Sequence, residues 1–225
     1  MRLKSTWSAT TVRRLAAAMT TATQLAAGPV AAQGVQPSFD CSKAASQVER
    51  SICANPRLSE LDVLLAQSYN AAASRTVDKL GLRKDQNKWR TKVRDKCGNE
   101  ACIAASYEGR IGALRVTPEN AEVLVLPSTS VELQPVKTKV ARGAVLYGTL
   151  VFNRDAAGGF VALLVGDREY RMRYVWDLPQ QLLANVNRLE DAAATVSVIG
   201  DLITWPDGTV TFDDRSRTTV LVPRN

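Results

Sequence analysis

The stretch Ser38–Cys53, SFDCSKAASQVERSIC, places two cysteines around the signal for one short helix. Ser46 and Glu49 fit the capping-box pattern, in which both side chains accept backbone N–H groups at the start of a helix. A continuous helix from Cys41 to Cys53 would hold their sulfur atoms far apart, so a bond between them requires the chain before Ser46 to fold back. Whether these cysteines are ligands, catalysts or disulfide partners depends on the compartment, which the N-terminus indicates.

Residues 1–32 have the pattern of an export signal. They contain four basic residues and no acidic ones, with a mildly apolar run that is followed by small residues. Val30 and Ala32 match the small-residue rule for signal-peptidase cleavage, which predicts cleavage near Ala32. The apolar run contains threonine and glutamine and is too polar to span a bilayer. We therefore predict a signal peptide over 1–32, a short mature tail over 33–37 and a periplasmic or secreted product; a disordered N-terminal tail is the alternative.

All four cysteines lie in the predicted mature chain, and the sequence contains no histidine. An even number of cysteines in an exported chain indicates disulfides. Zinc would need all four thiolates, and no pair has the two-residue spacing of a zinc knuckle, so we predict no metal and no cofactor. The local pairs Cys41–Cys53 and Cys97–Cys102 are favoured. The rival pairing of Cys53 with Cys97 and of Cys41 with Cys102 stays open.

Residues 38–115 carry the signals of a small bundle of helices. Asn55-Pro56 supplies an N-cap and a proline in the first turn, after which apolar residues recur at three- and four-residue steps. Gly81 is placed to end this helix, and Gly98-Asn99 separates the two helices that follow. Short connections make consecutive helices antiparallel. A core this small gains from disulfides, which restrict the unfolded chain.

Residues 143–225 change to the two-residue period of strands, interrupted by a predicted helix near 178–192. In the strand over 169–176, aromatic residues alternate with Arg171 and Arg173, which we interpret as aromatic side chains facing the core and arginines facing water. Further strands are predicted over 145–152, 160–165, 195–203, 209–212 and 218–222. This order of elements predicts an OB-like barrel, with an SH3-like barrel as the alternative.

The predicted fold class is therefore α+β in two small domains. A disulfide-linked antiparallel helical bundle over 38–115 is followed by a small antiparallel β-barrel with one helix over 143–225. Prolines are spaced through 116–142, which predicts a linker with edge strands.

The charge of the mature chain is divided between the two parts. Without the four basic residues of 1–32, the chain has 25 basic and 22 acidic residues, a net charge of +3. Residues 38–115 carry 14 basic and 9 acidic residues, and residues from 117 onward carry 11 basic and 13 acidic ones. The strand-rich part thus offers no electrostatic funnel for phosphates. We predict no nucleic-acid partner and no membrane span.

The sequence offers few groups for catalysis. Without histidine, the usual general base and any histidine-dependent triad are absent, and oxidised cysteines cannot act as nucleophiles. Four acidic residues gather around a predicted hairpin, where they indicate turns rather than a carboxylate pair; they are Asp201, Asp207, Asp213 and Asp214. We predict no catalytic residues and no enzyme activity, and a cell-wall hydrolase is the weakest alternative.

A candidate binding surface lies on the helix predicted to follow Gly81. Lys84, Lys88 and Lys92 face away from its apolar stripe, and Arg83 and Arg90 flank them. An ordinary solvated helix face is the alternative interpretation of this run. Four other polar residues are predicted to be structural, through buried hydrogen bonds that fix helix register or through an ion pair with the neighbouring helix. These residues are Asp62, Gln86, Arg94 and Asp95.

A series of motifs occurs in order through residues 38–115. The motifs are Phe39-Asp40-Cys41, Val48-Glu49-x-x-Ile52-Cys53, Pro56-x-Leu58-x-x-Leu61-Asp62, Tyr69, Gln86-x-x-Trp89, Arg94-Asp95-x-Cys97, Cys102 and Tyr107-x-x-Arg110. Together they resemble the LprI-type lysozyme-inhibitor family. The resemblance implies an exported, non-enzymatic helical module that acts as an inhibitor or immunity-type binder of a lysozyme-like hydrolase in the cell envelope. A binding or scaffold module for an envelope protein or an anionic cell-wall polymer is the alternative.

Overall fold

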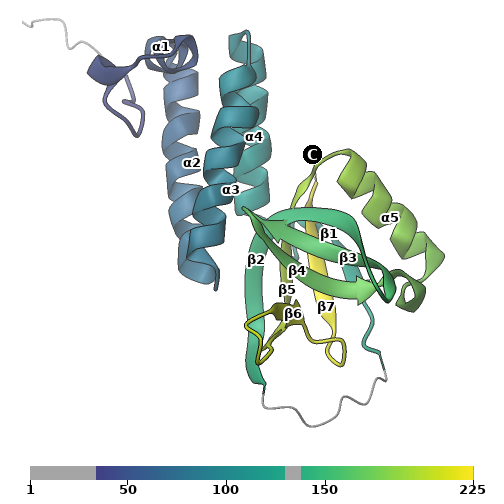
Figure 1. Ribbon diagram of the computed structural model, residues 1–225. Helices are drawn as coiled ribbons and strands as arrows, with labels where there is room; N and C mark the ends of the chain where they lie inside the picture. The colour runs from purple at the N-terminus through teal and green to yellow at the C-terminus, as the bar shows by residue number, and fades with distance from the viewer. Residues whose placement is uncertain (1–33, 130–137, 225) are drawn as a thin grey trace, which may run out of the picture. The chain divides into compact units, whose positions relative to one another are not determined.

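The computed structural model describes residues 34–129 and 138–224 (Figure 1). The predicted signal peptide over 1–32 and its cleavage near Ala32 lie outside the described residues. Gly34–Asn225 is one compact unit, in which a helical region with two disulfides precedes a mixed seven-stranded sheet. The predicted α+β class is confirmed at this level. The division of this unit into two domains stays a prediction.

Three of the four helices in the helical region begin where the sequence predicts. Its elements are η1 (Cys41–Lys43), α1 (Gln47–Ala54), α2 (Pro56–Arg75), α3 (Lys79–Lys92), η2 (Arg94–Lys96) and α4 (Glu100–Leu114). The predicted capping box is present, because Glu49 N donates to Ser46 Oγ over 3.1 Å and Ser46 N donates to Glu49 Oε2 over 3.0 Å. Asn55 caps α2 ahead of Pro56, and Asn99 caps α4.

The sheet contains a ring of five strands that carries two more strands on one side. Its elements are β1 (Ala121–Leu126), β2 (Lys139–Asp155), β3 (Gly158–Val165), β4 (Arg168–Tyr174), η3 (Val175–Asp177), α5 (Gln180–Asp191), β5 (Thr195–Thr204), β6 (Val210–Phe212) and β7 (Thr218–Pro223). The strand order is β1-β7-β5-β2-β3-β4-β6, and β6 also pairs with β5. A single parallel pair, Arg171 with Thr211, joins β4 to β6. The sheet is therefore mixed rather than antiparallel, and the ring is not a clear barrel.

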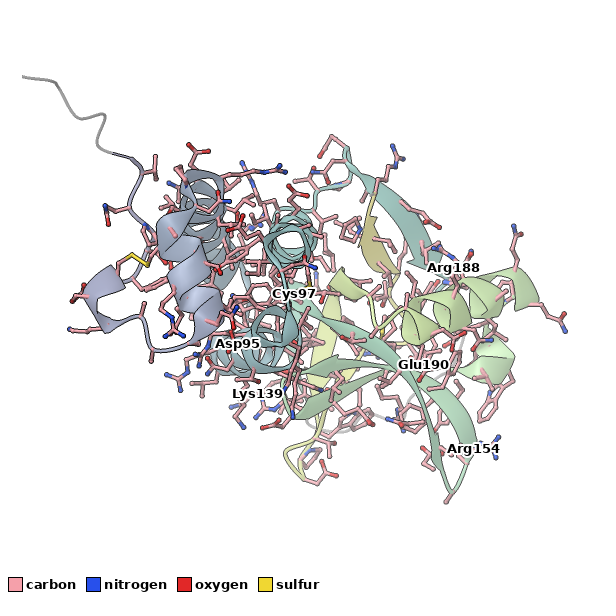
Figure 2. The ribbon with its side chains drawn as sticks, turned by 90° about the horizontal axis from the view of Figure 1, so that it is seen from above. Asp95, Cys97, Lys139, Arg154, Arg188 and Glu190 are labelled. Atoms are coloured by element: carbon pink, nitrogen blue, oxygen red, sulfur yellow. A yellow bond between two sulfur atoms is a disulfide. The ribbon has the colours of Figure 1, made fainter. Side chains whose placement is uncertain are left out.

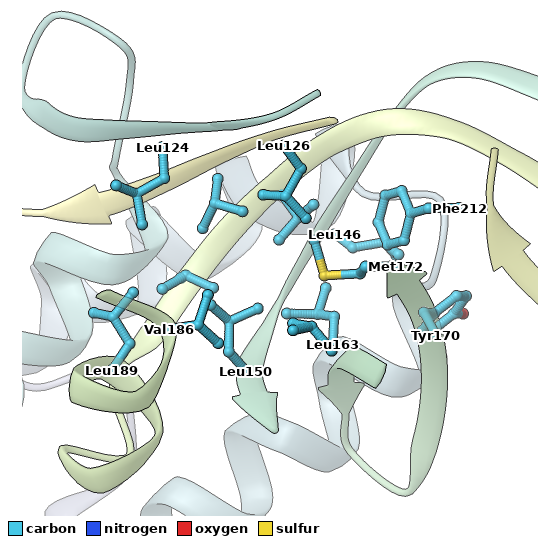
Figure 3. Packing of buried hydrophobic residues seen from close by; sticks show 14 of the residues in the cluster. Leu124, Leu126, Leu146, Leu150, Leu163, Tyr170, Met172, Val186, Leu189 and Phe212 are labelled. Atoms are coloured by element: carbon cyan, nitrogen blue, oxygen red, sulfur yellow. The ribbon is translucent and has the colours of Figure 1, made fainter. Parts of the chain in front are cut away.

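The core of the sheet lies between the strands and α5 (Figure 3). Leu146 and Leu150 of β2, Leu163 of β3 and Met172 of β4 are buried in it, and Val186 and Leu189 of α5 pack against the strands. α5 follows β4 and precedes β5 in the chain, and its apolar stripe is buried because it packs against the ring of strands.

The helical core is completed by a residue of the sheet. Tyr147 of β2 is 1% exposed and belongs to the same cluster as Leu82 and Tyr107. At this contact Tyr170 of β4 donates its hydroxyl hydrogen bond to Asp78 over 2.7 Å, and burial raises the pKa of Tyr170 to about 12. The helices and the sheet thus share buried contacts.

The second helix ends earlier than predicted, because the chain after it binds the sheet. α2 stops at Arg75, and Gly81 lies inside α3, whose N-cap is Asp78. Thr76 Oγ1 and Val77 N donate to Val145 O of β2 over 2.9 and 3.3 Å. Gly81 has a packing role instead: a Cβ atom there would clash with Val165 of β3.

The predicted alternation in β4 is wrong at Arg173 and Tyr174, and beyond the strand it is wrong at Trp176. Arg173 is 1% exposed and Trp176 is 58% exposed, the reverse of the prediction. The pairing register between β3 and β4 shifts between Val161 and Ala162, so the side-chain alternation does not continue past the irregularity. Trp176 lies in η3, after β4 has ended.

Candidate functional site

The two disulfides lie at one end of the helical region. Cys41 is bonded to Cys53 and Cys97 to Cys102, which confirms the favoured local pairs. Cys53 precedes the junction of α1 with α2, and the second bond closes the junction of α3 with α4. Asn55 Nδ2 donates to Glu100 Oε2 over 2.7 Å and joins these two junctions. The α2–α3 junction at the other end is the one that contacts β2.

Asp62 is a buried acceptor that ties the N-terminal segment to α4. It is 5% exposed; Tyr107 Oη donates to its Oδ1 over 2.8 Å, and Ser38 N donates to its Oδ2 over 2.6 Å. Burial, followed by the charge of Asp62, raises the pKa of Tyr107, so its hydroxyl stays a neutral donor. The structure therefore places Asp62 in a hydrogen-bonded interior position.

Arg110 connects three elements through a buried charge pair. Its Nη2 lies 2.7 Å from Asp85 Oδ2 of α3, with side-chain exposures of 1% and 12%. Its Nε donates to Gln86 Oε1 over 2.8 Å, and its Nη1 lies 3.4 Å from Thr195 Oγ1 of β5. Gln86 is thus engaged by α4. The sequence patterns indicated no role for Arg110 or Asp85, although the motif Tyr107-x-x-Arg110 contains one of them.

Arg94 and Asp95 bond each other at the start of η2. Arg94 Nη2 and Nε lie 2.6 and 2.8 Å from Asp95 Oδ1, and the Arg94 side chain is 8% exposed. Trp89 packs edge-to-face on Tyr107, with ring centroids 5.7 Å apart. These side chains form the interior of the bundle near the second disulfide.

Five exposed cations of α3 form a surface that we call the basic face. It consists of Arg83, Lys84, Lys88, Arg90 and Lys92. Lys84 Nζ lies 2.7 Å from Asp167 Oδ2, and this bond holds the pKa of Asp167 below its ordinary value. The other four make no ion pair with any residue that the structure describes. Most of the positive charge of this face is therefore uncompensated.

A groove of about 940 Å³ runs beside the basic face, between α3 and α4 on one side and α5 with the ends of β5 and β7 on the other. Lys88 and Lys92 line its helical wall. Arg188 and Glu190 line the opposite wall, and Figure 2 shows both side chains on α5. Arg224 completes this wall.

The acidic side chains of the groove are already engaged. Asp85 is paired with Arg110, and Glu122 Oε2 lies 3.1 Å from Arg188 Nη2. Glu190 Oε1 accepts a hydrogen bond from the backbone N–H of Phe152 over 2.9 Å. Three cations therefore remain for a ligand, namely Lys88, Lys92 and Arg224. The groove has the electrostatic character of an anion-binding surface.

Residues 41–117 match the family model described as lysozyme inhibitor LprI. The match covers about a third of the chain. It includes α1 to α4 and both disulfides, and it confirms the resemblance seen in the motifs. No curated protein and no solved structure matches the chain.

The LprI segment, residues 41–117, contains most of the polar features described above. The hydrogen bond of Tyr107 to Asp62 and the ion pair of Asp85 with Arg110 lie within it, as does the whole basic face. The sheet and the α5 wall of the groove lie outside it. The groove is thus formed jointly by the LprI segment and by the part of the chain that the family model does not cover.

The family description is that of an inhibitor rather than an enzyme. Among the described residues, no three His, Cys, Asp or Glu side chains are grouped so as to hold a metal ion. None of the helices in the described part of the chain is long and apolar enough to cross a membrane. Two of the four acids predicted around the hairpin bond within their own turns, where Asp207 accepts from Thr209 and Asp213 pairs with Arg215. The other two bond other strands: Asp201 accepts from Gly143 N of β2, and Asp214 pairs with Arg173 of β4.

Proposed function

We propose that this protein is an exported, non-enzymatic binder of a lysozyme-type cell-wall hydrolase, which it inhibits. The match of residues 41–117 to lysozyme inhibitor LprI carries the proposal. Two disulfides fit an extracellular or periplasmic protein. Cleavage of the signal peptide near Ala32 is part of the same proposal, and the mass of the secreted chain tests it.

The hydrolase is proposed to dock away from the basic face when the hydrolase is itself basic. Like charges brought together at an interface oppose association and slow the encounter. Four cations of this face are uncompensated, so a cationic hydrolase would be repelled from it. The remainder of the mature chain, including the sheet half with its excess of acidic residues, is the better surface for such a partner.

Lysozyme-catalysed clearing of a cell-wall suspension tests this function directly. We expect the full mature chain to inhibit a basic lysozyme and Lys88→Glu/Lys92→Glu to raise its association rate about two- to fivefold at low salt, because repulsion is reduced. The rise should disappear at high ionic strength. Failure of the native chain to inhibit would refute the function.

A matched control separates the basic face from the total charge. Arg142→Glu/Arg154→Glu makes the same charge change at two exposed positions of β2. Because these positions lie on the sheet half, where docking is proposed, it should raise the association rate at least as much as the α3 variant does. If Lys88→Glu/Lys92→Glu instead abolishes inhibition while the control does not, the basic face is the docking surface and the proposed docking away from it is wrong.

The uncompensated cations favour a second candidate function, the binding of an anionic cell-wall polymer along the groove. Lys88, Lys92 and Arg224 would contact the polymer. We expect Lys88→Ala/Lys92→Ala to weaken co-sedimentation with such a polymer about tenfold, equivalent to about 1.4 kcal/mol. Arg142→Ala/Arg154→Ala serves as the control and should sediment like the native chain. Binding that does not respond to salt would contradict an electrostatic contact.

A further inference from the structure

Trp176 forms an exposed aromatic platform at the end of β4. Its ring is stacked on that of Tyr174, with centroids 4.3 Å apart and planes 10° from parallel. Tyr174 in turn meets Phe160 of β3 edge-to-face over 6.2 Å. Since Trp176 is 58% exposed, one face of its indole remains open to solvent.

The platform is held rigidly by the turn between β2 and β3. Gly158 has a φ of +137°, and a Cβ atom there would lie 2.5 Å from the indole of Trp176, so only glycine lets the ring lie against the turn. Tyr174 Oη donates to Asp155 Oδ2 over 2.9 Å. The guanidinium of Arg171 lies 5.2 Å from the centre of the Tyr174 ring. A large apolar side chain is thus held on the surface between Tyr174 and Gly158, with more than half of its area exposed.

A pocket of about 740 Å³ is lined by residues of β4, of β6 and of the β5–β6 turn. Phe160 and Arg171, which both contact the Tyr174 ring, belong to its lining, as does Trp205 of the β5–β6 turn. Its other polar lining residues are Arg168, Glu169, Asp207, Thr209 and Thr211. The face therefore carries two tryptophans with hydrogen-bonding side chains between them.

The charges on this face select against highly charged ligands. Two arginines and two acidic residues line the pocket, and Asp155 stands next to the platform. A polyanion would be repelled by the acids, and the groove beside α3 is the better site for it. An uncharged ligand with many hydroxyl groups has no such conflict, because it can both donate to carboxylates and accept from guanidinium groups.

We propose that the outer face of β3 and β4, from Trp176 to Trp205, binds a neutral oligosaccharide. A sugar ring has an apolar C–H face that can lie on an indole, with hydroxyl groups at its edge for Arg171 and the pocket residues. A fixed aromatic ring loses little conformational freedom when it binds. In five-stranded rings of this connectivity, the corresponding strands and turns bind oligonucleotides or oligosaccharides, and the acidic residues on this face favour the uncharged ligand. The proposal goes beyond hydrolase inhibition and does not depend on it.

Titration calorimetry of the mature chain with a neutral tetramer of N-acetylglucosamine tests the site. We expect Trp176→Ala to weaken binding at least about tenfold, equivalent to about 1.4 kcal/mol. Trp176→Tyr keeps a stacking ring and should stay within about threefold, less than about 0.7 kcal/mol. Leu80→Ala removes an equally exposed apolar side chain from α3 and should bind like the native chain.

Three results would overturn the proposal. They are no binding by the native chain at millimolar sugar, native binding by Trp176→Ala, and tighter binding of a single-stranded oligonucleotide than of the sugar. An unchanged thermal midpoint of Trp176→Ala shows that the variant is folded. This variant should still inhibit lysozyme, so the failure of one proposal is distinguishable from the failure of the other.

Discussion

Replacing Arg173 with methionine is expected to lower the free energy of unfolding by about 3–5 kcal/mol. Its side chain is completely buried and lies 2.8 Å from Asp214 Oδ1. It also donates to the backbone oxygens of Pro127 and Ser216 over 3.1 and 2.6 Å. Methionine fills similar space but leaves these acceptors and a partly buried carboxylate without a donor.

The charge pair alone does not account for this expected loss. Burial lowers the pKa of Arg173 and raises the pKa of Asp214. For both ions, the cost of desolvation therefore exceeds the stabilisation from their mutual attraction. The hydrogen bonds to the backbone carbonyls are therefore the main contribution of Arg173 to stability, since its guanidinium joins the end of β1 to the β6–β7 turn. Arg173→Lys should fail to restore stability, because an ammonium cannot reproduce the geometry of the planar fork.

Urea unfolding followed by circular dichroism measures the effect. Arg168→Met is the control, since Arg168 is an exposed arginine of the same strand and its loss should change stability by about 0.5 kcal/mol or less. A loss below about 1 kcal/mol for Arg173→Met would show that water or other donors replace the guanidinium.

Removing the Cys41–Cys53 disulfide by the double replacement with serine is expected to cost about 3 kcal/mol. The bond closes a loop with a sequence separation of 12, so its loss restores many conformations to the unfolded chain. The same change at Cys97 and Cys102, with a separation of 5, should cost about 2 kcal/mol. The order of these two effects follows from loop length.

Unfolding with and without reductant measures both bonds, and a variant with serine at all four positions should not respond to reductant. Alkylation of the native protein without reductant should label no cysteine. Labelled thiols in the folded protein would contradict the two disulfides, and a larger loss at the shorter loop would contradict their ranking by loop length.

The helical region could be predicted because its signals are local. The capping box at Ser46 and the Asn55 cap involve atoms a few residues apart, and the sequence displays them directly. Gly81 misled the prediction because α2 ends through a contact of Thr76 with Val145, 69 residues away. The actual signal was Asp78, whose side chain accepts from Gly81 N and caps α3.

The strand region shows what a periodic pattern omits. The two-residue alternation of the strand correctly predicted that Tyr170 and Met172 lie in the core. It could not reveal the register shift opposite Arg173, nor the three acceptors from two other segments that make a buried arginine tolerable there. Trp176 was misplaced because the strand ends before it.

The candidate site was visible only in part for the same reason. The helical period gave the exposure of the basic face. The wall of the groove opposite α3, with Arg188 and Arg224, is formed by residues that the topology of the sheet brings to α3. The oligosaccharide platform depends on Gly158 and Asp155 positioning rings from other strands, which no single stretch of sequence displays.

The place of β7 in the sheet sets the order in which the chain can fold as it emerges. β7 lies between β1 and β5, although it is the last described strand to emerge. The disulfides close over short loops early in the chain, whereas β1 must wait for β7 to supply its partner, with Ala121 opposite Pro223. Long-range pairing of this kind is slow. Until β7 arrives, β1 and β5 present unpaired edges to other emerging chains, so we expect this interval to be the one in which the protein aggregates most readily.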